Sequence, residues 1–231
     1  MTDHPRAQAR PGLPLLVAVI ASRDDIHKAE RLRHAPDVFE LRLDAFADEN
    51  QRLLDFARKV RVPLIVTARH PREGGLHNLR TTRRLQLLHL FLPLAAYVDI
   101  ELRWLAELGS VLPASKARRV GVIVSVHELE KTPEVSELHR LAAAAAAFHA
   151  DVFKVATRTE TAADVARLVK FYDEADGPMP ISAMGIGRLG RHARRLLALR
   201  GSALNYAHLG TRAVEGQFSL GELRRIVPSR R

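Results

Sequence analysis

The stretch that decides the fold lies between Val120 and Ala156. It begins with the apolar run Val120-Gly121-Val122-Ile123-Val124-Ser125-Val126, continues through a segment of helical periodicity at 134–148, and ends in the run Val152-Phe153-Lys154-Val155-Ala156. Short apolar runs separated by one helix-length segment are typical of parallel strands joined by crossover helices. This stretch therefore predicts a strand–helix–strand unit.

The same unit repeats along the chain. Eight strand-then-helix units within 231 residues predict a single-domain (β/α)8 TIM barrel of the α/β class over residues 14–231, with residues 1–13 as a flexible N-terminal extension. The expected strands are 15–20, 38–43, 63–67, 97–102, 120–126, 152–156, 180–184 and 204–209. The expected helices lie near 25–34, 47–60, 81–93, 103–109, 134–148, 161–175, 190–199 and 219–226.

Composition narrows the classes of function. The chain has no cysteine, which excludes disulfides, thiolate nucleophiles and cysteine-bound metals. It has neither a long apolar span nor the order of a signal peptide, so we expect a cytoplasmic protein without a membrane partner. The net charge of +10 would suit nucleic acid or a small anionic ligand, but the arginines are scattered and lack interleaved aromatic residues. This pattern argues against nucleic acid, although a biased base composition would also explain the arginines.

Charged and polar residues cluster where the expected strands end. In a barrel, active sites lie at the carboxyl ends of the strands, and charges that face inward must pair or bind a ligand. Any one of these residues could belong to an internal ion pair, but their convergence predicts a functional site. They are Glu40, Arg42, Asp44, Thr67, Arg69, Asp99, Glu101, Ser125, His127 and Lys154.

Lys154 stands inside an apolar run, in a chain with only six lysines among its 36 lysines and arginines. Arginine cannot deprotonate at accessible pH, whereas burial favours the neutral form of a lysine amine, which is nucleophilic. The sequence therefore suggests a catalytic amine. The alternative is a lysine that extends from a strand end with its ammonium in water.

Two other motifs carry less weight. The stretch 185–190, Gly-Ile-Gly-Arg-Leu-Gly, matches a dinucleotide fingerprint, but it falls in the seventh unit and no acidic residue closes the following strand. We interpret this loop, with Arg194 in the helix after it, as an anion cradle, and expect no cofactor.

His70, Glu73 and His77 could be metal ligands, but Pro71 would break a helix that held them on one face, so we expect no metal. Glu73 would instead orient a histidine, or be a solvated loop charge.

Taken together, these residues resemble the type I 3-dehydroquinate dehydratases, a Schiff-base family of the shikimate pathway, from about residue 15 to 227. The segments that carry the resemblance are Glu40-Leu41-Arg42-Leu43-Asp44, Thr67-Ala68-Arg69, Glu73-Gly74-Gly75, Asp99-Ile100-Glu101, Ser125-Val126-His127, Phe153-Lys154-Val155-Ala156, Met184-Gly185 with Gly190 and Arg194, Gly201-Ser202-Ala203-Leu204, and Gly216-Gln217.

The resemblance implies a mechanism. Lys154 would form an imine with the C3 ketone of 3-dehydroquinate, and His127, held by Glu73, would move the C2 proton to the departing C1 hydroxyl, yielding 3-dehydroshikimate. It also implies a homodimer that needs neither metal nor cofactor. The implied substrate-binding residues are Glu40, Arg42 and Arg69 for the ring hydroxyls, Arg194 for the carboxylate, Gln217 at the lid and Met184 against the ring.

The chain departs from the family in the loop after the eighth strand. The family has serine, alanine, proline, glycine and glutamine there, whereas this chain has Ala213-Val214-Glu215-Gly216-Gln217. Loss of the serine hydroxyl removes one hydrogen bond, worth about 0.5–1.5 kcal/mol, which would weaken but not abolish the reaction. Glu215 adds a negative charge near an anionic substrate unless it points outward.

The residues also allow two other functions: a Schiff-base aldolase, or a weakly active relative that binds an anionic metabolite. They leave open whether the role is biosynthetic or catabolic.

Overall fold

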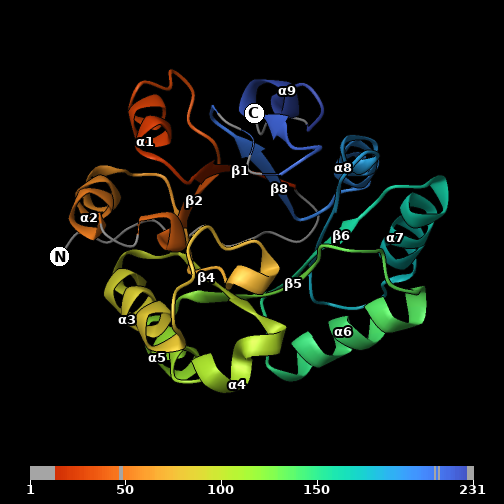
Figure 1. The fold of residues 1–231 in the computed structure, drawn as a ribbon, viewed down its shortest axis with the longest axis horizontal. Helices are drawn as coiled ribbons and strands as arrows, with labels where there is room; N and C mark the ends of the chain where they lie inside the picture. The colour runs from red at the N-terminus through yellow and green to blue at the C-terminus, as the bar shows by residue number, and fades with distance from the viewer. Residues whose placement is uncertain (1–13, 47–48, 211, 213, 228–231) are drawn as a thin grey trace.

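The computed structural model describes residues 14–46, 49–210, 212 and 214–227, and it forms a single α/β barrel (Figure 1). The predicted extension, 1–13, and Ala213 of the lid loop lie outside the described residues. One sheet of nine strands runs in the order β7-β6-β5-β4-β3-β2-β1-β8-β9, with every pair parallel. Figure 1 shows the helices surrounding the strands, from α1 in red to α9 in blue. The predicted TIM barrel is confirmed.

The strands and helices follow the predicted alternation. The strands are β1 (Leu15–Ile20), β2 (Val38–Arg42), β3 (Leu64–Thr67), β4 (Tyr97–Glu101), β5 (Gly121–Glu128), β6 (Val152–Arg158), β7 (Ile181–Ile186), β8 (Leu204–His208) and β9 (Phe218–Ser219). The helices are α1 (Arg23–Glu30), α2 (Asn50–Lys59), α3 (Thr81–Phe91), α4 (Leu105–Leu108), α5 (Val111–Arg118), α6 (Val135–Ala147), α7 (Ala162–Glu174), α8 (Gly190–Leu199) and α9 (Leu220–Arg224). None of the described helices has the length and apolar character required to cross a bilayer.

The barrel closes where β7 meets β8. The backbone N–H of Ala203 donates to the carbonyl of Ile181 at 2.9 Å, and the hydroxyl of Ser182 donates to the carbonyl of Leu204 at 2.7 Å. The hydroxyl of Ser202 accepts from the backbone N–H of Ala183 at 3.1 Å. Serine side chains therefore replace part of a regular ladder at this seam.

Two apolar layers stabilise the barrel. The first lies inside it and consists of strand side chains such as Val17, Ile65, Ile123 and Val152, all fully buried. The second fills the space between the sheet and the helices, with alternate strand residues such as Ala18 facing the helices. Because side chains alternate along a strand, the inner layer also fixes which polar residues point into the barrel.

Some local predictions were incomplete. Helix α5 was missed because its buried face contains Ser115, whose hydroxyl donates to the carbonyl of Val111, so the apolar period is weak. Strand β9 was missed because two residues carry no period of their own. Strand β7 was expected to end at Met184 but continues to Ile186, which pairs with Arg158 of β6. That partner is distant in sequence, so no local pattern reports it.

Candidate active site

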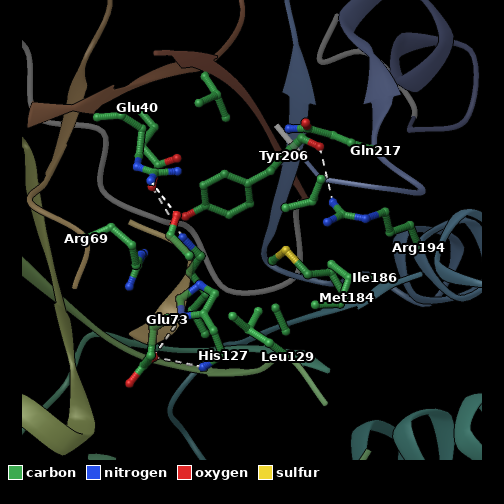
Figure 2. Close-up of a pocket in the computed structure, with 16 residues that line it drawn as sticks. Glu40, Arg69, Glu73, His127, Leu129, Met184, Ile186, Arg194, Tyr206 and Gln217 are labelled. Atoms are coloured by element: carbon green, nitrogen blue, oxygen red, sulfur yellow. Dashed lines mark hydrogen bonds and ion pairs between the residues drawn. The ribbon is translucent and has the colours of Figure 1, made fainter. Parts of the chain in front are cut away.

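The carboxyl ends of the strands surround a pocket that encloses about 600 Å3, part of it open to solvent (Figure 2). All nine residues to which the family resemblance gives a role line it, together with seven to which it gives none. The predicted residues are Glu40, Arg42, Arg69, Glu73, His127, Lys154, Met184, Arg194 and Gln217. The others are Val19, Gly74, Leu129, Ala156, Ile186, Tyr206 and Val214.

Lys154 lies deep in this pocket. Its side chain is only 4% exposed, so the alternative of a lysine reaching into water is wrong. The Nζ atom lies 2.8 Å from Asp99 Oδ2, 3.3 Å from Glu40 Oε1 and 4.0 Å from the centroid of the Tyr206 ring. Two carboxylates and an aromatic face therefore compensate the desolvation of the ammonium.

Asp99 is held by more than the lysine. It accepts hydrogen bonds from the hydroxyl of Ser125 at 2.6 Å and from Arg69 Nη2 at 3.0 Å. Arg69 Nη1 also donates to Ser125 at 2.8 Å and lies 3.3 Å from Glu101 Oε1. Burial alone would raise the pKa of Asp99, but Arg69 and Lys154 outweigh it and hold that pKa well below its ordinary range. Asp99 is therefore a carboxylate beside the lysine amine.

His127 and Glu73 form a pair next to the lysine. The strand register places Ser125 opposite Lys154, so His127, two residues further along β5, also points into the barrel. Glu73 comes from the turn Pro71–Glu73 after β3, and its Oε2 accepts from the backbone N–H of His127 at 3.0 Å and lies 3.1 Å from the ring Nδ1. A proton on Nδ1 satisfies this contact and leaves Nε2 with its lone pair.

The environment favours a neutral imidazole. Burial, together with the positive charges of Arg69 and Lys154, lowers the pKa of His127 well below its usual value. Burial also raises the pKa of Glu73 to about 7, because the nearby Arg69 and Arg103 only partly offset it. The imidazole is therefore neutral and available as a base at neutral pH.

Glu40 and Arg42 reach the pocket from β2. Arg42 makes a bidentate contact with Asp44 at 3.0 and 2.7 Å and donates to the carbonyl of Gly74 at 3.0 Å. Asp44 also accepts the backbone N–H groups of Arg69 and Leu76. This network anchors the loop that carries Glu73, so Arg42 is both a pocket residue and a support.

Arg194, on α8, differs from the other two arginines. Its guanidinium donates to the carbonyls of Gly185 at 2.8 Å and Tyr206 at 3.5 Å, and it has no ion-pair partner in the part of the chain that the structure describes. The residue is 7% exposed, and burial lowers its pKa to about 10. A buried cation with only dipolar partners is chemically suited to an anionic ligand.

The glycine loop before α8 does not form the predicted anion cradle, because Gly187 and Gly190 do not line the pocket. A Cβ at Gly190 would lie 3.1 Å from the carbonyl of Gly185, and one at Gly185 would lie 2.7 Å from the Cβ of Ala193. These glycines allow α8 to pack closely on β7. They act on the site by bringing Arg194 to the pocket.

The three side chains considered as metal ligands do not form a metal site. The ring of His70 stacks on Trp104 with centroids 3.6 Å apart, while Glu73 turns to His127. Across the ranges that the structure describes, no group of three histidine, aspartate or glutamate side chains is placed to hold a metal ion.

The lid loop reaches the pocket through Val214 and Gln217. Gln217 is buried, whereas Glu215 is exposed and does not line the pocket. Its negative charge therefore points away from the place where an anion would bind.

Comparison with known proteins identifies the family of the chain that forms this pocket. The family model described as type I 3-dehydroquinase matches residues 16–230. The chain belongs to the type I 3-dehydroquinase family. The recognition of this family from the sequence, and the prediction of a lyase, are thereby confirmed.

Individual type I 3-dehydroquinases and their relatives agree along nearly the whole chain. The 3-dehydroquinate dehydratase of Thermococcus gammatolerans is 32% identical over 217 residues, covering 92% of this chain and 97% of that protein. The corresponding protein of Haloarcula marismortui is 34% identical over 224 residues, covering 90% and 94%. The crystal structure of 3-dehydroquinate dehydratase from Geobacillus kaustophilus superposes with a TM-score of 0.83 at 27% identity, covering 93% of this chain and 90% of that one.

Two residues in contact with Lys154 received no role from the sequence. Asp99 was expected to face inward, but its contact with Lys154 depends on the curvature of the barrel across two strands. Tyr206 was treated only as part of a strand. Tyr206 lies two residues after Leu204, whose side chain faces the barrel interior. Because side chains alternate along a strand, this spacing was the signal that could have placed Tyr206 in the interior as well.

Proposed function

We propose that this chain dehydrates 3-dehydroquinate to 3-dehydroshikimate through an imine on Lys154. The observation that carries the proposal is one pocket that combines a buried lysine amine, a neutral histidine held by a carboxylate, and a buried arginine without an acidic partner. An amine and a base suit proton removal next to a ketone, and the arginine suits a carboxylate.

The reaction begins when the amine of Lys154 attacks the C3 ketone and the ketone oxygen leaves as water. Glu40, whose Oε1 lies 3.3 Å from Nζ, is placed to accept the proton that the ammonium must lose before it attacks, while Asp99, at 2.8 Å, stays ionised and orients the amine. The cationic imine then acidifies the hydrogens on the neighbouring carbon by acting as an electron sink.

His127 carries out the proton transfers. Its Nε2 takes a proton from C2, and the electron pair of that C–H bond moves into an enamine. The enamine then expels the C1 hydroxyl, which leaves as water with the proton returned by His127. Glu73 fixes the tautomer of His127 through Nδ1. Addition of water to the imine releases the product and restores the amine.

The remaining residues position the substrate. Arg194 would bind the carboxylate, and Glu40 and Arg42 the ring hydroxyls. Met184 would pack against the ring, and Gln217 would cover it from the lid side. Arg69 contributes mainly by holding Asp99 and Ser125, because its guanidinium already contacts both. A cytoplasmic homodimer completes the proposal, and light scattering of the purified protein tests the pairing.

The test is intact mass spectrometry after incubation with 3-dehydroquinate and reduction with borohydride. We expect a single adduct of the reduced ligand imine on the wild type and none on Lys154→Ala. Lys170→Ala, an exposed lysine that pairs with Glu174 on α7, is the matched control and should keep the adduct. A folded wild type without an adduct would exclude the imine mechanism.

A further inference from the structure

Tyr206 presents to the pocket a polar atom that no group in the described part of the chain satisfies. The residue is 5% exposed and lines the pocket, yet its hydroxyl has no hydrogen-bond partner among the residues that the structure describes. A buried hydroxyl without a partner costs free energy in the empty protein. A ligand that supplied the missing acceptor would recover that cost.

The position of Tyr206 is tied to the reacting lysine. Lys154 Nζ lies over its ring, 4.0 Å from the centroid, and the backbone carbonyl of Tyr206 accepts from Arg194 Nη1 at 3.5 Å. Figure 2 shows the ring crossing the pocket, from the Gln217 side toward Glu40. The tyrosine therefore lies between the proposed carboxylate site and the proposed imine.

The hydroxyl is held as a donor. Burial, followed by the negative charges of Glu40 and Asp99, raises the pKa of Tyr206 well above its ordinary value, so the phenol keeps its proton. Its neighbour Glu40 is an acceptor, because its carboxylate already accepts from Thr67 at 2.9 Å and from Lys154 at 3.3 Å. One donor and one acceptor on the same side of the lysine match an alcohol, which donates and accepts at once.

We propose that Tyr206 is a substrate-binding residue whose hydroxyl donates to the substrate alcohol on the carbon next to the ketone, while that alcohol donates to Glu40. This inference rests on the proposed function, because it takes the ketone carbon to be bonded to Lys154 Nζ. The substituent on the adjacent ring carbon then lies beside Nζ, over the ring of Tyr206. Tyr206 thus makes the site selective for a hydroxyl at this position, since an analogue without it leaves the phenol unpaired.

The experiment uses Tyr206→Phe, which removes one oxygen and keeps the ring under Lys154. Tyr172→Phe on α7, where the phenol lies near the carbonyl of Arg200, is the matched control. We expect Tyr206→Phe to melt at or above the wild-type temperature without ligand, because the lost hydroxyl has no partner. Its kcat/KM for 3-dehydroquinate should fall about 3- to 10-fold, mainly through KM, the range of one hydrogen bond.

A substrate analogue with hydrogen in place of that alcohol provides a second measurement. We expect the wild type to discriminate against the analogue about 3- to 10-fold more strongly than Tyr206→Phe does. If both proteins form the borohydride adduct, discriminate equally against the analogue and have the same kcat/KM for 3-dehydroquinate, Tyr206 is a packing residue. That result would overturn this inference and leave the proposed function standing. Absence of the adduct from the wild type would overturn the proposed function and this inference with it.

Discussion

Replacing Arg194 with methionine is expected to stabilise the free protein while weakening substrate binding. Burial lowers the pKa of Arg194 from 12.5 to about 10, a penalty on the charged form of about 3 kcal/mol. Methionine fills a similar volume without the charge, but it gives up the hydrogen bonds to the carbonyls of Gly185 and Tyr206, each worth about 0.5–1.5 kcal/mol. The net gain in the free energy of unfolding should be about 1 kcal/mol, which raises Tm by about 2–4 °C in a domain of this size.

The same change should impair the reaction. Loss of a charge-assisted contact with a carboxylate costs about 1.5–3 kcal/mol, so KM should rise roughly 10- to 150-fold. Thermal unfolding without ligand and steady-state kinetics measure the two effects, with Arg195→Met, an exposed arginine on the same helix, as the control. If Arg194→Met lowered Tm below that of the control and kept the wild-type KM, the guanidinium would be a structural group, and the assignment of the carboxylate site would be wrong.

Two further predictions concern the charges around Lys154. Because the pKa of Glu73 is about 7, kcat/KM should rise as the pH increases through 7, and Glu73→Gln should lower activity and remove that rise. The raised pKa also means that Glu73 contributes stability below pH 4.5 that is lost as the pH approaches 7. Urea titrations should therefore show that the free energy of unfolding falls less over this pH range in Glu73→Gln than in the wild type. Asp99→Asn should lower the free energy of unfolding by about 3–5 kcal/mol, because it leaves two buried cations undercompensated.

Controls for these variants come from partly or fully exposed carboxylates. Glu174→Gln changes an exposed residue on α7 that pairs with Lys170 and does not line the pocket, and it should keep the pH profile of the wild type. Asp173→Asn breaks an exposed pair with Arg200 and should change stability by less than about 1 kcal/mol. An unchanged pH profile in Glu73→Gln, or an Asp99→Asn as stable as Asp173→Asn, would contradict the electrostatic account of the site.

The sequence alone determined the order of the elements and the composition of the site. Apolar periods of two and 3.6 residues are local properties, so they located all eight barrel strands, while the weak period of α5 and the two residues of β9 escaped. Site residues such as Glu40, His127 and Lys154 could be selected because each is a charged or polar residue in an apolar strand, on the side that faces into the barrel.

Only the tertiary structure decided which charges are paired and which remain available. Lys154 meets Glu40 across 114 positions of sequence, Arg69 is held by Asp99, and Arg194 remains without an acidic partner in the described residues. The hydroxyl of Tyr206, which has no hydrogen-bond partner in that part of the chain either, is another such case. Pairing and desolvation sum contributions from segments that are distant in sequence and adjacent only once the barrel has closed. The sequence therefore determined which charged groups converge on the site, and the closed barrel determined which of them are free to bind a substrate.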